Sequence, residues 1–141
     1  MPDNLDKRPA DEINRIAAVE VMGWKAVEVM GWMLPKAYWA DKTGEHAGFY
    51  DTRPSCDYFD PANRLDHAFI LLKKLRRRWW YYLRDCGGQD TPIGGRRYVE
   101  GYLQRRKGGT QYTACYGVAD INNPALATTL AAIRAAREEQ T

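Results

Sequence analysis

The sequence predicts an α+β fold, in which an antiparallel sheet of about five strands and three helices form layers resembling an α-β-α sandwich. Apolar side chains recur with helical spacing in three segments, while shorter segments bounded by Gly-rich turns are typical of strands. The expected order of elements is αββαβββα. The 141 residues are enough for one such domain, which we expect over residues 10–141, after a flexible N-terminal arm over residues 1–9.

The first helix is expected over residues 10–22, because apolar residues recur there near a 3.6-residue period and Gly23 provides a natural stop. The motif Val-Glu-Val-Met-Gly-Trp then occurs twice, at residues 19–24 and 27–32. One copy can end the helix with its glycine and place its tryptophan in a strand. The other copy is expected to extend the helix or to fill a loop.

A hairpin is expected over residues 36–50, around the turn sequence Asp41-Lys-Thr-Gly44. The second helix is expected to start with Asp60 as its N-cap and Pro61 as its first residue. An N–H at that position would have no partner within the helix, so its absence in proline costs nothing. The side chains expected to form its buried stripe are Leu65, Ala68, Phe69, Leu72 and Leu75.

Three further strands and a helix complete the predicted fold. Residues 77–84 indicate a strand with rings and cations on both faces, and residues 96–106 and 110–119 indicate a second hairpin. The last helix is expected to begin with Asn123 as its N-cap and Pro124 as its first residue.

Charge is distributed unevenly along the chain. The formal net charge is +3, but residues 73–107 contain eleven Lys and Arg against three acidic residues, so this segment carries +8 and the remainder −5. Six Trp and Tyr lie in the same basic segment: Trp79, Trp80, Tyr81, Tyr82, Tyr98 and Tyr102. Cations interleaved with flat rings are what binding of phosphates and bases requires, although a solvated basic face would have the same composition.

Strand periodicity divides the candidate ligand-binding residues into two groups. Arg77, Trp79 and Tyr81 share one face of the first strand of the segment, and Arg96, Tyr98 and Tyr102 share one face of the second. In such a site the arginines would bind phosphate and the rings would stack on bases. Arg105 and Asn122, the latter close to a helix N-terminus, complete the candidate set. Packing of the rings against helices and simple helix capping are the alternative explanations.

Signals for catalysis or for a resident metal are poor. His46 and His67 are isolated, and Cys56, Cys86 and Cys115 are widely spaced, so we expect no metal, no cofactor and no enzymatic activity. The polar N-terminus lacks the apolar core of a signal peptide, and no apolar run approaches the length of a membrane span. A cytoplasmic protein without membrane contact is therefore expected.

Several short motifs resemble the phage ABA-sandwich domain family of small phage and prophage proteins. The opening helix Ile13-Asn-Arg-Ile-Ala-Ala-Val-Glu-Val-Met-Gly-Trp24 is similar to the family's, as is Phe59-Asp-Pro-Ala-Asn-Arg-Leu-Asp-His-Ala-Phe69, which leads into a helix ending in Lys74-Leu75. The family typically closes with a strand and an Ala-rich helix, here residues 112–119 and 124–136. The resemblance covers most of residues 11–136.

Some members of that family resemble the Thoeris anti-defence sponges, phage proteins that bind a cyclic ADP-ribose isomer or cyclic oligonucleotides and withhold these immune signals without cleaving them. The resemblance thus implies a homo-oligomeric cyclic-nucleotide sponge in the cytoplasm of an infected bacterium. Two alternatives remain open. The basic aromatic segment 73–107 is equally typical of a nucleic-acid-binding or inhibitor protein, and the domain could serve a protein interaction of another kind.

Overall fold

The computed structural model describes residues 4–30, 35–51, 57–86 and 98–140, and they form an α+β fold. The helical elements are a short 3-10 turn Leu5–Lys7, α1 Ala10–Ile16 with a π-helical continuation Ala17–Val21, α2 Leu65–Leu75 and α3 Pro124–Glu139. The strands are β1 Lys25–Met30, β2 Pro35–Ala40, β3 His46–Tyr50, β4 Trp80–Cys86, β5 Tyr98–Gly108 and β6 Gln111–Asp120.

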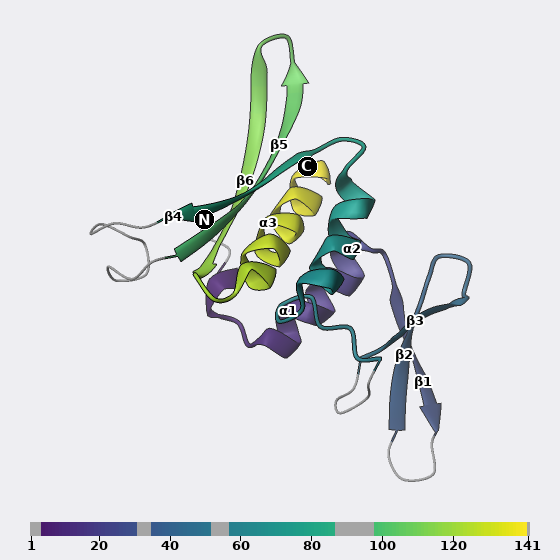
Figure 1. The fold of residues 1–141 in the computed structure, drawn as a ribbon. Coiled ribbons are helices and arrows are strands. Elements are labelled where there is room, and N and C mark those ends of the chain that lie inside the picture. Colours follow the sequence, from purple (N-terminus) through teal and green to yellow (C-terminus); the bar gives the residue numbers. More distant parts are fainter. Residues whose placement is uncertain (1–3, 31–34, 52–56, 87–97, 141) are drawn as a thin grey trace.

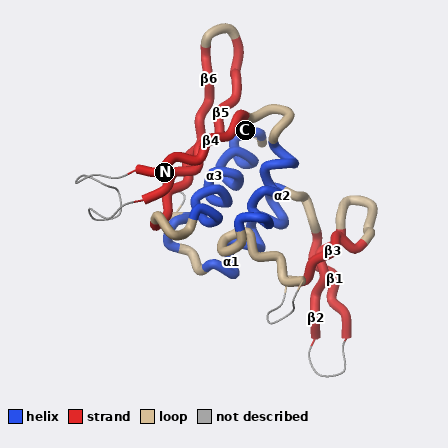
Figure 2. Tube along the Cα trace, in the orientation of Figure 1, coloured by secondary structure: helices blue, strands red, loops and turns tan. Residues whose placement is uncertain are grey.

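The described strands form two antiparallel sheets of three, with the orders β1-β2-β3 and β4-β5-β6. The helices lie together between the two sheets, and the β5–β6 hairpin projects beyond them (Figures 1 and 2). The α+β class and the three α-helices agree with the sequence prediction. The single sheet of about five strands does not, because β1 is an additional strand and the order becomes αβββαβββα.

The repeated motif adopts two different structures. Its first copy ends the first helix, where Gly23 takes the left-handed backbone conformation (φ 72°) and Trp24 enters the core. The start of the second copy, Val27 to Met30, lies in strand β1, so the expectation that this copy extends a helix or fills a loop is wrong. Pairing along β2 supplies the tertiary context, and valine suits a strand better than a helix.

Helix α2 begins four residues later than the pair Asp60-Pro61 would place it. Its N-cap position is Arg64, and Asp60 instead closes a turn, with its carbonyl accepting from the N–H of Arg64 at 2.8 Å. The Asp60 carboxylate accepts hydrogen bonds from the amides of Asn14 (2.8 Å) and Asn63 (3.0 Å). The expectation of an Asp60 N-cap is therefore wrong, because this carboxylate ties the turn to helix α1.

The buried stripe of α2 is also rotated relative to the expectation. Ala68 and Leu75 are buried as expected, but Leu71 and His67 share the stripe with them, and Phe69 is 43% exposed. The buried stripe expected with Phe69 is therefore wrong at this position, and Leu71 takes its place in the core.

Two residues near the N-terminus, Leu5 and Asp6, contact the rest of the domain. Leu5 is fully buried, and the Asp6 carboxylate forms an ion pair with Arg134 of α3 at 3.0 Å. Residues 4 and 6–9 are exposed, so the flexible arm expected over residues 1–9 stays a prediction, and residues 1–3 lie outside the described part.

Helix α3 occupies the centre of the core and fixes the position of the β4–β5–β6 sheet. As expected, Asn123 caps it by accepting from the Leu126 N–H at 3.1 Å, and Pro124 is its first residue. The helix backbone lies directly on the cross-strand pair Gly101 and Gly117. A Cβ atom on Gly117 would stand 2.1 Å from the Ala127 carbonyl oxygen, and one on Gly101 would stand 2.7 Å from it.

Rings attach the β1–β2–β3 sheet to the helices. Trp24 and Phe49 stack at 5.9 Å between ring centroids, and Phe59 packs against both. The His67 ring of α2 completes the cluster at 5.0 Å from Phe49, and its Nδ1 accepts the Asp60 N–H at 2.9 Å. His67 is thus a neutral core residue with its remaining proton on Nε2.

We expect Gly117→Ala to destabilise the fold by about 1–3 kcal/mol, because the added methyl group must displace the α3 backbone. Urea denaturation followed by circular dichroism measures this. Val118→Ala, on the opposite face of β6, is the control and should cost less. Equal stability of Gly117→Ala and the wild type would contradict the close packing of α3 on the sheet.

We also expect the free energy of unfolding to fall as the pH drops below about 6.5. Burial, followed by the nearby Arg64 charge, lowers the pKa of His67 below its ordinary value of 6.5. The unfolded chain therefore binds the proton first, so this contribution is complete above pH 6.5 and is lost below it. Urea midpoints at pH 7.5 and 5.5 should differ less in His67→Gln than in the wild type. The same difference in both proteins would contradict this role of His67.

Candidate functional site

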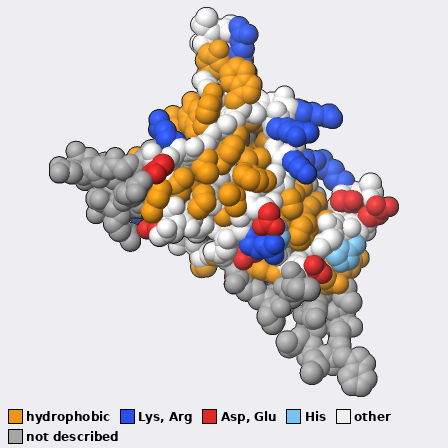
Figure 3. All heavy atoms as spheres, in the orientation of Figure 1, with side chains coloured by type: hydrophobic (Ala, Val, Ile, Leu, Met, Phe, Trp, Pro, Cys, Tyr) orange, Lys and Arg blue, Asp and Glu red, His pale blue; other side chains and the backbone are white. Residues whose placement is uncertain are grey.

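The two faces of the β4–β5–β6 sheet differ sharply in character. Side chains that alternate toward α3 are apolar or absent, and include Val99, Gly101 and Leu103 on the central strand β5. The opposite face, called here the outer face, carries exposed rings. The exposed aromatic side chains of the outer face are Trp80, Tyr82, Tyr112 and Tyr116, between 46% and 57% exposed. Figure 3 shows hydrophobic side chains gathered along this region and up the projecting hairpin.

Three tyrosines form a row across the outer face, one from each strand. Tyr82, Tyr102 and Tyr116 are cross-strand neighbours in the register of the sheet. The ring centroids of Tyr82 and Tyr102 are 5.9 Å apart, and those of Tyr102 and Tyr116 are 5.0 Å apart. The rings are tilted by 48° and 55° to each other, so together they form an uneven surface rather than a closed stack. This group is called the tyrosine row below.

The tyrosine row lines a hollow of about 510 Å³, which Leu83 and Arg84 complete. This volume lies within the usual range for small-molecule sites. The Arg84 guanidinium donates to the Glu100 carboxylate at 2.6 Å, which fixes its position at the rim and offsets its charge. Burial, with the neighbouring phenols and Glu100, raises the pKa of Tyr102, so its phenol is a neutral hydrogen-bonding group at physiological pH.

The structure places two of the expected ligand-binding residues on the outer face. Tyr102 is the centre of the tyrosine row, and Tyr98 lies four residues away on the same side of β5. Glu100 lies between Tyr98 and Tyr102 on this side of β5. The sequence expectation that Tyr98 and Tyr102 share a face of one strand is confirmed by this register.

Three other expected residues lie on the side of the helices. Trp79 is 2% exposed, its Nε1 donates to Glu139 at 2.9 Å, and the Arg105 guanidinium lies 5.2 Å from its ring centroid. The Tyr81 hydroxyl is 2.6 Å from that of Thr128 on α3. These contacts belong to the core, which was the alternative explanation, so Trp79, Tyr81 and Arg105 are not part of the exposed ring surface.

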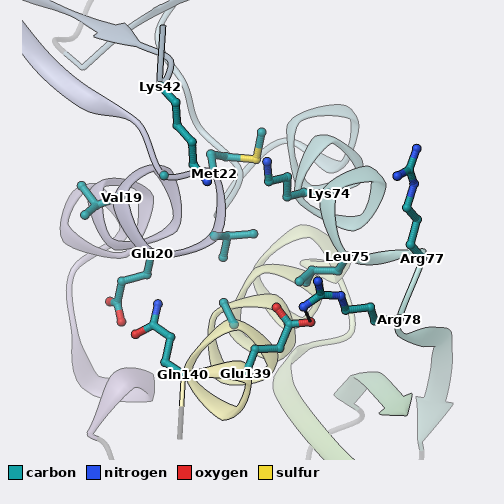
Figure 4. A pocket seen from close by; sticks show the side chains of 13 residues that line it. Val19, Glu20, Met22, Lys42, Lys74, Leu75, Arg77, Arg78, Glu139 and Gln140 are labelled. Atoms are coloured by element: carbon teal, nitrogen blue, oxygen red, sulfur yellow. Dashed lines mark ion pairs between the residues drawn. The ribbon is translucent and has the colours of Figure 1, made fainter. Parts of the chain in front are cut away.

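Arg77 lies at a second hollow of about 530 Å³, which shares no lining residue with the hollow at the tyrosine row (Figure 4). In this view Lys42 and Lys74 extend toward Met22, whereas Arg77 points away. The ends of the π-helical turn, α2 and α3 line this hollow. Helix C-termini carry partial negative charge, which accounts for the cations around them and disfavours an anion there.

Acidic side chains at the second hollow also disfavour an anion there. Glu139 pairs with Arg78 at 3.7 Å, and Glu20 pairs with Arg137 at 2.8 Å. Carboxylates of the domain itself therefore offset the charges of Arg78 and Arg137. We do not assign a ligand to this second hollow.

The remaining two expected residues lie elsewhere. Asn122 is an exposed residue of the turn before α3, with its N–H donating to the Asp120 carboxylate at 3.1 Å. Arg96 lies outside the described residues. Of the seven expected residues that the structure describes, it thus brings only Tyr98 and Tyr102 to the outer face.

Sequence reasoning missed Tyr82, Tyr116 and Arg84 as site residues. The sequence did contain a signal for them. Tyr116, the partner of Tyr102 on β6, is flanked by the small residues Cys115 and Gly117. A strand with small residues on one side and rings on the other turns its small residues toward a helix. This pattern on β6 would have selected Tyr82 as an exposed site residue, in place of Trp79 and Tyr81, which face the helices.

Few groups among the described residues are suited to catalysis. No cluster of three or more His, Cys, Asp or Glu that could hold a metal ion occurs in the described segments. Burial raises the pKa of the Cys115 thiol to about 11, so it stays protonated and is a poor nucleophile at neutral pH. In the same part of the chain, no helix combines the length and apolar character needed to span a bilayer.

Comparisons with protein-family models, with curated proteins and with solved structures gave no match to this chain.

Proposed function

We propose that this protein binds a small nucleotide on the tyrosine row and holds it without changing it chemically. The observation that carries the proposal is the alignment of Tyr82, Tyr102 and Tyr116 across an uncovered sheet face, around a hollow of about 510 Å³. Flat exposed rings bind the faces of bases with little dependence on sequence. The Tyr102 phenol and the Arg84 guanidinium at the rim offer hydrogen bonds to sugar and phosphate.

The distribution of charge favours a small ligand over a long polyanion. A nucleic acid backbone needs a continuous stripe of cations. The described part of the basic segment does not supply one on the outer face, since Arg105 points to the core, Arg77 lies at the second hollow and Arg106 is held at the hairpin turn. Arg84 is offset by Glu100. Stacking, rather than ion pairing, would therefore provide most of the affinity.

The resemblance to the phage ABA-sandwich family extends this proposal to a biological role. It suggests that the ligand is a cyclic nucleotide immune signal, such as a cyclic ADP-ribose isomer or a cyclic oligonucleotide. The protein would then act as a phage anti-defence sponge, as a homo-oligomer in the bacterial cytoplasm. Sequestration needs only a binding surface and no catalytic group.

We expect Tyr102→Ala to weaken binding of a cyclic nucleotide by about 5- to 150-fold, because it removes the central ring of the row. Calorimetry against a panel of cyclic nucleotides measures the affinity, and heating the complex should return the ligand intact. Tyr81→Phe is the matched control, since its ring faces α3 and its loss of one hydroxyl should leave the affinity unchanged.

The salt dependence of the affinity separates the two kinds of ligand. One or two ion pairs predict a loss of only about 3- to 7-fold between 50 and 200 mM salt, whereas a polyanion with six to ten phosphate contacts would lose about 10³- to 10⁵-fold. Absence of binding to every cyclic nucleotide, together with tight and salt-sensitive binding of duplex DNA, would contradict the proposal.

A further inference from the structure

A second group of exposed rings lies on the outer face, beyond the tyrosine row. Trp80 of β4 and Tyr112 of β6 are 57% and 50% exposed, and their ring centroids are 6.4 Å apart. Trp80 is opposite Gln104, and Tyr112 lies next to the β5–β6 turn, so the pair extends toward the tip of the projecting hairpin, on the same side of the sheet as Tyr102. This pair is called the Trp80–Tyr112 pair below.

The strand register gives the spacing between the two groups of rings. Trp80 is opposite Gln104 of β5, two residues from Tyr102, and Tyr112 is opposite Arg106, four residues from Tyr102. At about 3.4 Å per residue, the second group therefore begins about 7 Å from the row and ends about 14 Å from it. One base cannot cover both groups, whereas two bases splayed on a sheet surface can.

The residues around the Trp80–Tyr112 pair suit a nucleotide as well. Gln104 lies between the pair and the tyrosine row and carries both a donor and an acceptor for a base edge. The Arg106 Nε donates to the Gly109 carbonyl at 2.7 Å, which holds this side chain at the hairpin turn. Among the described residues no carboxylate pairs with Arg106, so its remaining N–H groups are available to a phosphate.

We infer that the outer face binds a ligand with two bases joined through phosphate, with one base on the tyrosine row and the other on the Trp80–Tyr112 pair. This inference rests on the proposed function and specifies its ligand as a dinucleotide step. A free linear or cyclic dinucleotide and a segment of single-stranded nucleic acid share this chemistry.

The test compares the affinities of the full chain for four ligands by calorimetry: AMP, the linear dinucleotide pApA, cyclic di-AMP and a ten-residue oligo-dA. The linear or cyclic dinucleotide should bind at least about 10-fold more tightly than AMP. Trp80→Ala and Tyr112→Ala should each remove most of this advantage while leaving the affinity for AMP unchanged. Phe69→Ala, which removes an exposed ring on helix α2 rather than on the sheet, is the control and should alter neither affinity.

The comparison of the four ligands also distinguishes a free dinucleotide from a segment of single-stranded nucleic acid. Preference for cyclic di-AMP over the oligonucleotide supports a free dinucleotide, and preference for oligo-dA supports a single strand. Equal affinities for AMP and both dinucleotides, unchanged in Trp80→Ala, would overturn the two-base inference but leave the proposed function standing. No binding of any of the four ligands by the wild-type chain would count against the proposed function itself.

Self-association is the competing use of the Trp80–Tyr112 pair, and ultracentrifugation of the same variants tests it. We expect Trp80→Ala to leave the sedimentation of the protein unchanged. A wild-type oligomer that dissociates in this variant, without a dinucleotide advantage in the wild type, would overturn the inference and assign the pair to an interface between copies.

Discussion

The contact between helix α3 and the glycine pair Gly101–Gly117 is the constraint on which the rest of the domain depends. The α3 backbone approaches so closely that even one methyl group on either glycine would meet the carbonyl oxygen of Ala127. Tyr102 follows Gly101 and Tyr116 precedes Gly117 in the chain. Both tyrosines must then point away from the helix, because side chains alternate along a strand. The packing that builds the core on one side of the sheet therefore places the tyrosine row on the other.

This arrangement also separates rings from charges. The basic segment contains both in close succession along the sequence, but strand alternation and the end of α2 distribute them over three environments. Trp79 and Arg105 pack together on the helix side, Arg78 after α2 pairs with Glu139 at the end of α3, and Tyr82 and Tyr102 remain on the outer face. An exposed surface rich in rings and poor in uncompensated charge is suited to stacking on bases, and this is the physical basis of the proposed function.

Much of the fold could be predicted from local signals. The Asn123-Pro124 start of α3, the Asp41–Gly44 turn and the alternation along β5 follow from side-chain chemistry that acts within a few residues. Tertiary context decided the remainder. The same three residues, Val-Glu-Val, are helical in one copy and extended in the other, and Asp60 bonds to Asn14 rather than capping α2.

The site was harder to predict than the fold because it depends on which side of a strand a helix covers. Strand alternation places Trp79 and Tyr81 on one face and Trp80 and Tyr82 on the other, but both faces carry rings. Only the small residues of the partner strands, such as Gly117, reveal which row faces α3.

The most direct test of the central claim is a nuclear Overhauser measurement on the protein bound to a cyclic nucleotide, with its tyrosine rings isotope-labelled. We predict contacts between base protons and the rings of Tyr82, Tyr102 and Tyr116. Ligand contacts confined to Lys42, Lys74 and Arg77 at the second hollow, with no contact to the tyrosine row, would contradict it.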